Sequence, residues 1–138
     1  IRDPEMSRGL GDVYKRQLVI EAGSKETAIM LFNTVYQAMP STSGEDEPMM
    51  NVLVWKEQKN WIVCIFPRNK HRPSCYTAEG DTNILISPAS VDMGGVFITP
   101  QEKDFEKITA NDIADILGEV CLRPAAFRIL IERIKQQL

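Results

Sequence analysis

Apolar residues recur along the chain at two spacings, and each spacing predicts a different kind of element. Residues 24–39 carry an apolar stripe at helical spacing, with Ser24 placed to cap the first turn and Pro40 placed to end the helix. The stripe consists of Ala28, Leu31, Phe32, Val35, Tyr36 and Met39. Just before it, the apolar run at residues 18–20 is typical of a short strand.

Further strands are expected in the middle of the chain. Residues 51–55 and 61–66 are rich in Val, Ile and aromatic residues, and the polar residues 56–60 between them predict an antiparallel hairpin. The apolar runs at residues 82–86 and 96–99 are expected to add two more strands. Together these runs predict an antiparallel sheet of four or five strands.

The last third of the chain has helical periodicity. Thr99, followed by Pro100 and Glu102, is typical of a helix start, and Thr109 is expected to cap a second helix. Pro124 is expected to open a last helix. Helices that follow an antiparallel sheet indicate the α+β class, and residues 18–138 show neither an internal repeat nor a dividing linker.

The first seventeen residues differ from the rest in composition. Residues 1–17 are polar and charged with no sustained period, which is typical of an unstructured tail. Residues 12–17 (DVYKRQ) resemble the translation of a transposase end used in preparing DNA libraries, so the segment is either a sequencing or cloning artefact or a native N-terminus. On the first interpretation, residues 18–138 are the C-terminal part of a domain that is incomplete at its N-terminal side.

Composition and charge exclude several classes of protein. The 138 residues are 43% hydrophobic and 25% charged, which is typical of a globular domain and argues against disorder. Sixteen Lys and Arg against nineteen Asp and Glu give a net charge of −3, so binding to nucleic acid or to an anionic membrane is not expected. The apolar runs are far shorter than the roughly 20 residues of a membrane span. Three cysteines favour reduced thiols and a cytoplasmic location.

A basic cluster follows the second strand of the expected hairpin. Arg68, Lys70, His71 and Arg72 place three fixed positive charges and an imidazole within five positions of an otherwise acidic chain. Guanidinium and ammonium groups suit a phosphate or pyrophosphate, so these four residues are candidate phosphate-binding or nucleotide-binding residues. The alternative is a solvated loop whose arginines pair with acids elsewhere, since no glycine-rich phosphate loop accompanies the cluster.

A second candidate loop spans residues 87–95. Its serines, carboxylate and glycine pair, represented by Ser87, Ser90, Asp92 and Gly94, could let the backbone approach a ligand and accept hydrogen bonds from sugar hydroxyls. The alternative is an ordinary turn, because Pro, Gly and Asp are common turn residues.

Other chemistries have little support in the sequence. Cys64, Cys75 and Cys121 lack the spacing of a zinc site, and no metal or cofactor is expected. Cys75 lies beside the basic cluster and could have a lowered pKa, with His71 as its base. A thiol or redox function would require fast alkylation of Cys75 near neutral pH, and slow labelling is expected. No serine hydrolase motif is present, and no catalytic residue is assigned.

Several of these motifs together resemble a known family. In order along the chain they are the helix, the NVLV strand at residues 51–54, IFPR at 65–68, SVDMGG at 90–95 and the helical region from Thr99 to Cys121. From about residue 18 to 130, the chain resembles the C-terminal part of GDP-L-galactose phosphorylases and diadenosine tetraphosphate phosphorylases. These belong to the histidine-triad (HIT) and galactose-1-phosphate uridylyltransferase superfamily. The resemblance implies a HIT-like antiparallel sheet with flanking helices that binds a nucleotide sugar or dinucleotide and phosphate.

The resemblance also implies roles for individual residues. Pro67-Arg68 looks like the dipeptide that ends the corresponding family strand, which makes Arg68, Lys70 and Arg72 candidate phosphate contacts. Asp92-Met93 looks like a Glu-Met whose acid holds the sugar, which makes Asp92, with Ser87 and Ser90, a candidate sugar or acceptor contact. Asp for Glu shortens the reach by one methylene.

One departure from the family pattern bears on catalysis. In the relatives, a histidine of a His-x-His-x-His or His-x-His-x-Gln strand attacks the α-phosphorus, whereas this chain has His71 alone. The chain is therefore expected to be a fragment of a phosphorylase or nucleotidyltransferase that lacks the histidine triad and is inactive by itself. The alternative is a complete noncatalytic module that binds a phosphorylated ligand or a protein partner through residues 68–72. If N-terminal strands of the sheet are missing, the sheet edge left exposed would favour association between chains, including formation of a homodimer.

Overall fold

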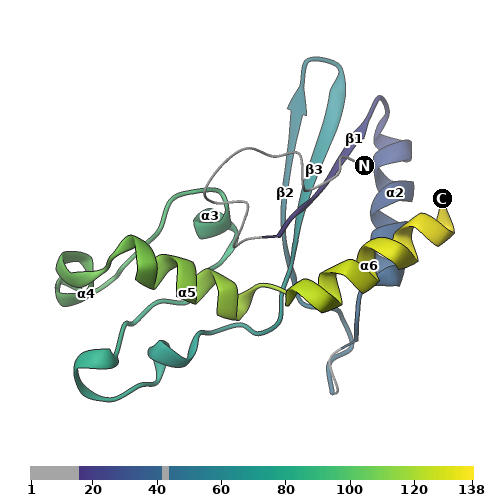
Figure 1. Ribbon diagram of the computed structural model, residues 1–138. Coiled ribbons are helices and arrows are strands. Elements are labelled where there is room, and N and C mark those ends of the chain that lie inside the picture. Colours follow the sequence, from purple (N-terminus) through teal and green to yellow (C-terminus); the bar gives the residue numbers. More distant parts are fainter. Residues whose placement is uncertain (1–15, 42–43) are drawn as a thin grey trace.

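A computed structural model describes residues 16–41 and 44–138, so residues 1–15 of the tail expected at residues 1–17 lie outside these ranges. Within them the chain forms one three-stranded antiparallel sheet and five helices, which confirms the α+β class. The elements, shown in Figure 1, are β1 (Leu18–Ala22), α2 (Lys25–Ala38), β2 (Met50–Glu57), β3 (Asn60–Pro67), α3 (Ser90–Met93), α4 (Glu102–Lys107), α5 (Ala110–Val120) and α6 (Pro124–Gln137). Two short 3₁₀ turns, η2 (Ser74–Tyr76) and η3 (Gly80–Thr82), follow the sheet.

The last strand in the chain is the central strand of the sheet. The order is β1-β3-β2, with Leu18 opposite Ile65 on one side of β3 and Leu53 opposite Cys64 on the other. Every residue of β3 from Ile62 onward is buried, because its alternate side chains face two different hydrophobic clusters. The hairpin confirms the expectation for residues 51–66, and its strands extend until only two residues, 58 and 59, form the turn.

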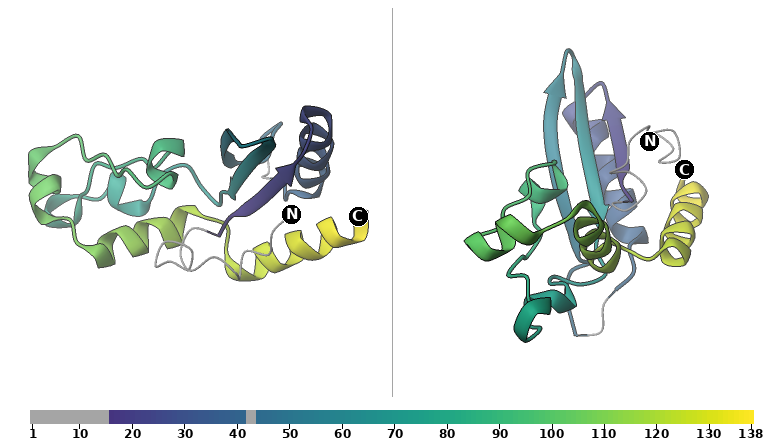
Figure 2. Two further views of the ribbon diagram at one scale, coloured as in Figure 1. Left: turned by 90° about the horizontal axis from the view of Figure 1, so that it is seen from above. Right: turned by 60° about the vertical axis from the view of Figure 1, so that its left-hand side comes forward.

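Helices cover both faces of the sheet. On one face, Val63 and Ile65 of β3 pack in a cluster with buried residues of α2 and α6. On the other face, Cys64 and Phe66 pack with residues of α3 and α5. Figures 1 and 2 show the result, an elongated molecule with α2 and α6 at one end and α4 at the other. The chain that follows β3, which carries both candidate loops, extends from the sheet toward the α4 end (Figure 1).

The expected helix starts are confirmed for three helices. The Ser24 hydroxyl accepts a hydrogen bond from the backbone N–H of Thr27 (3.1 Å) at the start of α2. Thr109 and Asp112 form a reciprocal capping box at the start of α5, with distances of 3.1 and 2.9 Å. Pro124 is in the first turn of α6.

The strands expected at residues 82–86 and 96–99 are wrong. The backbone N–H groups in these runs bond to loop oxygens or carboxylates instead of a neighbouring strand: Leu85 donates to Asp104 (2.9 Å) and Ile98 donates to Asp92 (3.1 Å). Consequently the described sheet has three strands and not four or five. The helix expected to start at Thr99 begins later, at Glu102, with Gln101 as its N-cap.

Core packing of α6 generates a first prediction. Leu130 is 1% exposed in the cluster between α6 and the sheet, whereas its neighbour Ile129 is 55% exposed. Leu130→Ala is expected to lower the free energy of unfolding by about 2–5 kcal/mol, because it removes buried contacts and leaves a cavity. Ile129→Ala is the matched control on the same helix, with an expected change within about 0.5 kcal/mol. Urea denaturation followed by circular dichroism measures both, and equal effects would contradict the placement of α6.

Candidate functional site

The centre of the candidate site is a buried arginine. Arg68 directly follows β3 and is only 7% exposed. Its guanidinium group makes five hydrogen bonds, as many as it has N–H groups. The acceptors are the backbone oxygens of Val120 (3.3 Å), Pro88 (2.8 Å), Lys70 (3.0 Å) and His71 (2.8 Å), and the side-chain oxygen of Asn51. Arg68 therefore joins β2, both candidate loops and the end of α5.

Burial lowers the pKa of Arg68, while Cys121 and Asp92 nearby favour the charged form. A guanidinium group stays protonated in proteins, so the buried charge is offset by its five oxygen acceptors. A phosphate contact by Arg68 would require one of these bonds to be exchanged. The phosphate contact expected of Arg68 therefore stays a prediction. In the structure, Arg68 holds the two candidate loops together.

The two candidate loops meet at this arginine. Asn51 accepts a hydrogen bond from Arg68 and donates one to the hydroxyl of Ser90 (3.4 Å). Pro88, whose backbone oxygen accepts from Arg68, immediately follows Ser87, which is exposed. The basic cluster and the 87–95 loop are thus neighbours in space, although Arg68 and Ser87 are nineteen positions apart in the sequence.

Asp92 shapes the second loop from within. It is 6% exposed, and its carboxylate accepts hydrogen bonds from the backbone N–H groups of Ala89 (2.8 Å) and Ile98 (3.1 Å). These bonds close the segment around α3, at whose end Gly94 is exposed. A Cβ at Gly94 would lie 3.3 Å from the backbone oxygen of Val91, so the loop is packed closely there.

The cations of the basic cluster have different surroundings. Lys70 pairs with Glu119 of α5, which also accepts a hydrogen bond from the backbone N–H of Ser74 (2.8 Å). Burial alone would raise the pKa of Glu119, but the hydrogen bonds from Lys70 and Ser74 outweigh it and hold the pKa below its usual value. His71 and Arg72 are exposed, and the Arg72 guanidinium lies over the ring of Tyr76.

Cys75 lies in a different electrostatic environment from the one expected. It lines an open pocket of about 530 Å³ together with Asp81, Asp112, Asp115 and Glu119. Burial and the charge of Glu119 raise the pKa of Cys75, so the thiol is not activated at neutral pH. Among the residues that the structure describes, no group of three or more His, Cys, Asp and Glu side chains could hold a metal ion.

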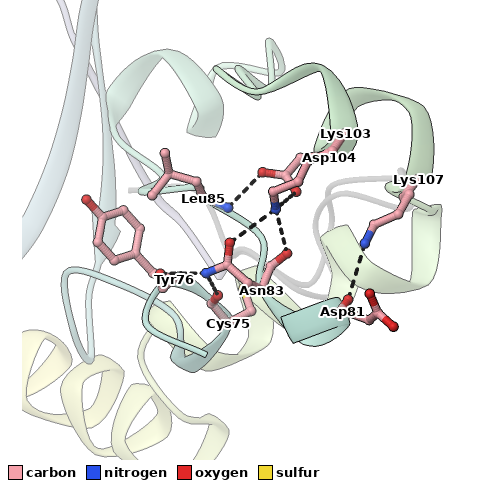
Figure 3. A network of polar contacts seen from close by, with 8 residues as sticks. All are labelled: Cys75, Tyr76, Asp81, Asn83, Leu85, Lys103, Asp104 and Lys107. Atoms are coloured by element: carbon pink, nitrogen blue, oxygen red, sulfur yellow. Dashed lines mark hydrogen bonds and ion pairs between the residues drawn. The ribbon is translucent and has the colours of Figure 1, made fainter. Parts of the chain in front are cut away.

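A polar network that the sequence did not reveal supports this side of the molecule (Figure 3). Asp104 is completely buried and accepts hydrogen bonds from the backbone N–H of Leu85 (2.9 Å) and from the ammonium group of Lys103 (2.7 Å). Lys103 also donates to Asn83, whose amide donates to the backbone oxygens of Cys75 (3.3 Å) and Tyr76 (3.1 Å). Asp104 lies in a run of charged residues, which is typical of a solvent-exposed segment. The pattern of apolar and polar positions therefore gave no sign that its carboxylate is buried.

The chain matches the family model described as "GDPGP1-like, C-terminal domain" over residues 13–138. The chain belongs to this family. The match confirms the resemblance drawn from the motifs at residues 51–54, 65–68 and 90–95, and the GDPGP1-like domain is part of a phosphorylase-like protein. Comparison with curated proteins and with solved structures gave no significant match.

The GDPGP1-like domain has no helix, within residues 16–41 and 44–138, that is long and apolar enough to cross a membrane. Its expected site residues differ in exposure, and Lys70 and Ser90 are intermediate. Arg68 and Asp92 are buried and hydrogen-bonded to the protein, whereas His71, Arg72 and Ser87 are exposed at the surface.

The five bonds of Arg68 predict a large structural effect. Arg68→Met is expected to lower the free energy of unfolding by about 3 kcal/mol or more, because it leaves several buried oxygens without donors. Arg72→Met, in the same loop but exposed, is the control and is expected to cost less than about 1 kcal/mol. Chemical denaturation of both variants measures the difference. Similar stability of the two would contradict the anchoring role of Arg68.

The buried carboxylate predicts a dependence on pH. The hydrogen bond from Lys103 lowers the pKa of Asp104 despite its burial. A carboxyl group whose pKa is depressed on folding contributes stability above its ordinary pKa and loses it as the pH falls. Asp104→Asn is therefore expected to destabilise the protein most at pH 7, and the difference from wild type is expected to shrink below about pH 4. Thermal unfolding at a series of pH values measures this, with Glu106→Gln on the same helix as the exposed control. A difference that does not vary with pH would contradict the assignment.

Proposed function

We propose that this domain supplies phosphate and sugar contacts to a nucleotide-sugar or dinucleotide phosphorylase or nucleotidyltransferase, and that the histidine that attacks phosphorus belongs to another part of that protein. The family match supports the phosphorylase-like origin. The single histidine of this chain, His71, lies between Lys70 and Arg72 and is not part of a triad. The chain by itself is therefore expected to give no turnover.

One observation carries the proposal: the basic cluster and the 87–95 loop adjoin at Arg68. Four of the five Arg68 bonds end on these two loops or on Asn51, which in turn contacts Ser90. A ligand with a phosphoryl group and a sugar needs cations and hydroxyl partners at neighbouring positions. In this proposal Lys70, His71 and Arg72 face the phosphoryl groups.

The neighbouring loop supplies the sugar side of the proposed site. Ser87 is exposed, Ser90 is partly exposed, and Gly94 leaves its backbone accessible. Asp92 uses its carboxylate on backbone N–H groups, so its contribution is to shape the loop that presents the serines. Arg68 likewise shapes the loop that carries the basic cluster, by donating hydrogen bonds to its backbone oxygens.

A noncatalytic module that binds a phosphorylated ligand or partner is the second candidate. The exposure of Arg72, with His71 beside it, favours it, because an exposed guanidinium group attracts phosphate groups whether or not a sugar follows. The two candidates differ in the sugar loop. Only the first requires Ser87 and Ser90 to contact the ligand.

Calorimetric titration separates the candidates. If the domain contacts both ends of a nucleotide sugar, a GDP-hexose is expected to bind more tightly than inorganic pyrophosphate, and binding of both should weaken with salt. Ser90→Ala is expected to weaken binding of the GDP-hexose alone, by about tenfold, because it removes a hydrogen bond to the sugar. Arg128→Ala on α6 is the control for general loss of positive charge. Equal affinity for both ligands and no effect of Ser90→Ala would favour the noncatalytic module, and no binding of either ligand would refute both candidates.

A further inference from the structure

We propose that Arg72 is the residue of the basic cluster that recognises phosphoryl oxygens, and that Tyr76 is a positioning residue that holds its guanidinium group in place. This inference rests on the proposed function and assigns its phosphate recognition to one cation. The Cζ atom of Arg72 lies 4.3 Å from the centre of the Tyr76 ring, within the range of a cation–π contact. The arginine is exposed, whereas Tyr76 is half-buried in the loop.

The other two fixed charges of the cluster are committed to protein groups. Arg68 directs all five N–H groups at protein oxygens. Lys70 forms an ion pair with Glu119, and the pairing partly neutralises its charge. Arg72 is different, because its guanidinium carbon lies over the ring of Tyr76 and its side chain is exposed. The N–H groups of a guanidinium group lie in its plane and point outward along its edge, where they can donate to an anion.

Tyr76 is suited to hold the arginine because its own backbone is fixed. It ends the short η2 turn, in which its N–H bonds to the backbone oxygen of the buried Pro73 (3.1 Å). Its backbone oxygen accepts from the Asn83 amide (3.1 Å), as Figure 3 shows. The ring therefore projects from a segment that is held at both its N–H and its C=O.

The support continues inward to the buried carboxylate. The backbone and side-chain oxygens of Asn83 both accept from Lys103 at 3.1 Å, and Lys103 bonds to Asp104 at 2.7 Å. A continuous set of polar contacts thus runs from a fully buried carboxylate on α4 to the backbone of Tyr76 (Figure 3). Such a support reduces the conformational freedom that Arg72 must lose when a ligand binds.

The geometry selects a ligand class. A guanidinium edge donates two parallel hydrogen bonds, which match two oxygens of one phosphoryl group or of a pyrophosphate. Lysine carries the same charge but neither the planar edge nor the flat face that stacks on a ring. If Arg72 acts in this way, a lysine with the same charge cannot replace it. The ring of Tyr76 then contributes more to phosphate binding than its hydroxyl group does.

The test uses the full chain, inorganic pyrophosphate and isothermal titration calorimetry. Arg72→Lys is expected to weaken pyrophosphate binding by about tenfold although the charge is kept. Tyr76→Leu is expected to weaken it by a similar factor, and Tyr76→Phe is expected to bind as wild type does. NMR adds a readout that general loss of stability would not give. The Arg72 Nε–H proton should be shifted by the aromatic ring in wild type and in Tyr76→Phe, should lose that shift in Tyr76→Leu, and should move on addition of pyrophosphate.

The outcomes distinguish this inference from the proposed function. Wild-type binding of pyrophosphate that persists unchanged in Arg72→Lys or in Tyr76→Leu would overturn the assignment of Arg72 and Tyr76 while leaving the proposed function in place. Absence of pyrophosphate binding by the wild type would overturn the inference, and the proposed function falls with it only if the GDP-hexose also fails to bind. Arg72→Lys keeps an exposed side chain on the surface, so its result holds even if Tyr76→Leu fails to fold.

Discussion

The buried positive charge of Arg68 is the constraint on which the arrangement of the loops depends. A guanidinium group placed in the interior is tolerated only when its N–H groups find acceptors, and here the five acceptors come from segments between 2 and 52 residues away in the sequence. The end of β3, the start of β2, the 87–95 loop and the end of α5 are all held at one point. The surface residues of the candidate site take their positions from this interior contact.

A second polar support has the same character on the other side of the site. Asp104 accepts hydrogen bonds from the backbone N–H of Leu85 and from the ammonium group of Lys103. Lys103 also donates to Asn83, whose amide donates to the backbone oxygens of Cys75 and Tyr76 and so fixes the turn that carries them. In both supports a charged side chain stabilises irregular backbone that no sheet or helix could satisfy. Loops supported in this way can be held as firmly as helices and strands. Their irregular backbone can also place side chains around a ligand.

Much of the regular structure could be predicted from the sequence, because helical periodicity, caps at Ser24 and Thr109, and the β-rich hairpin are local signals. The failures have a common cause. The runs at residues 82–86 and 96–99 have strand composition, but Leu85 donates its N–H to Asp104 and Ile98 donates its N–H to Asp92, and both carboxylates lie outside these runs. The sequence also pointed to Arg68, Lys70, His71 and Arg72 as one cluster. It could not separate the buried arginine from the exposed one, since that difference depends on oxygens of Val120 and Pro88 that only the fold brings near.

The order of the strands has a consequence for how the domain folds. β2 and β3 are joined by a two-residue turn, so their pairing closes a very short loop, whereas β1 must pair with β3 across the intervening helix and hairpin. Local pairing is entropically cheaper, so the hairpin is expected to form early and to provide the edge onto which β1 then docks. During that interval one side of the apolar strand β3 is without its neighbour. β1, which precedes the hairpin in the chain, thus joins the sheet after the hairpin has formed, and a chain held in the partly folded state would expose the strand most prone to pair with another molecule.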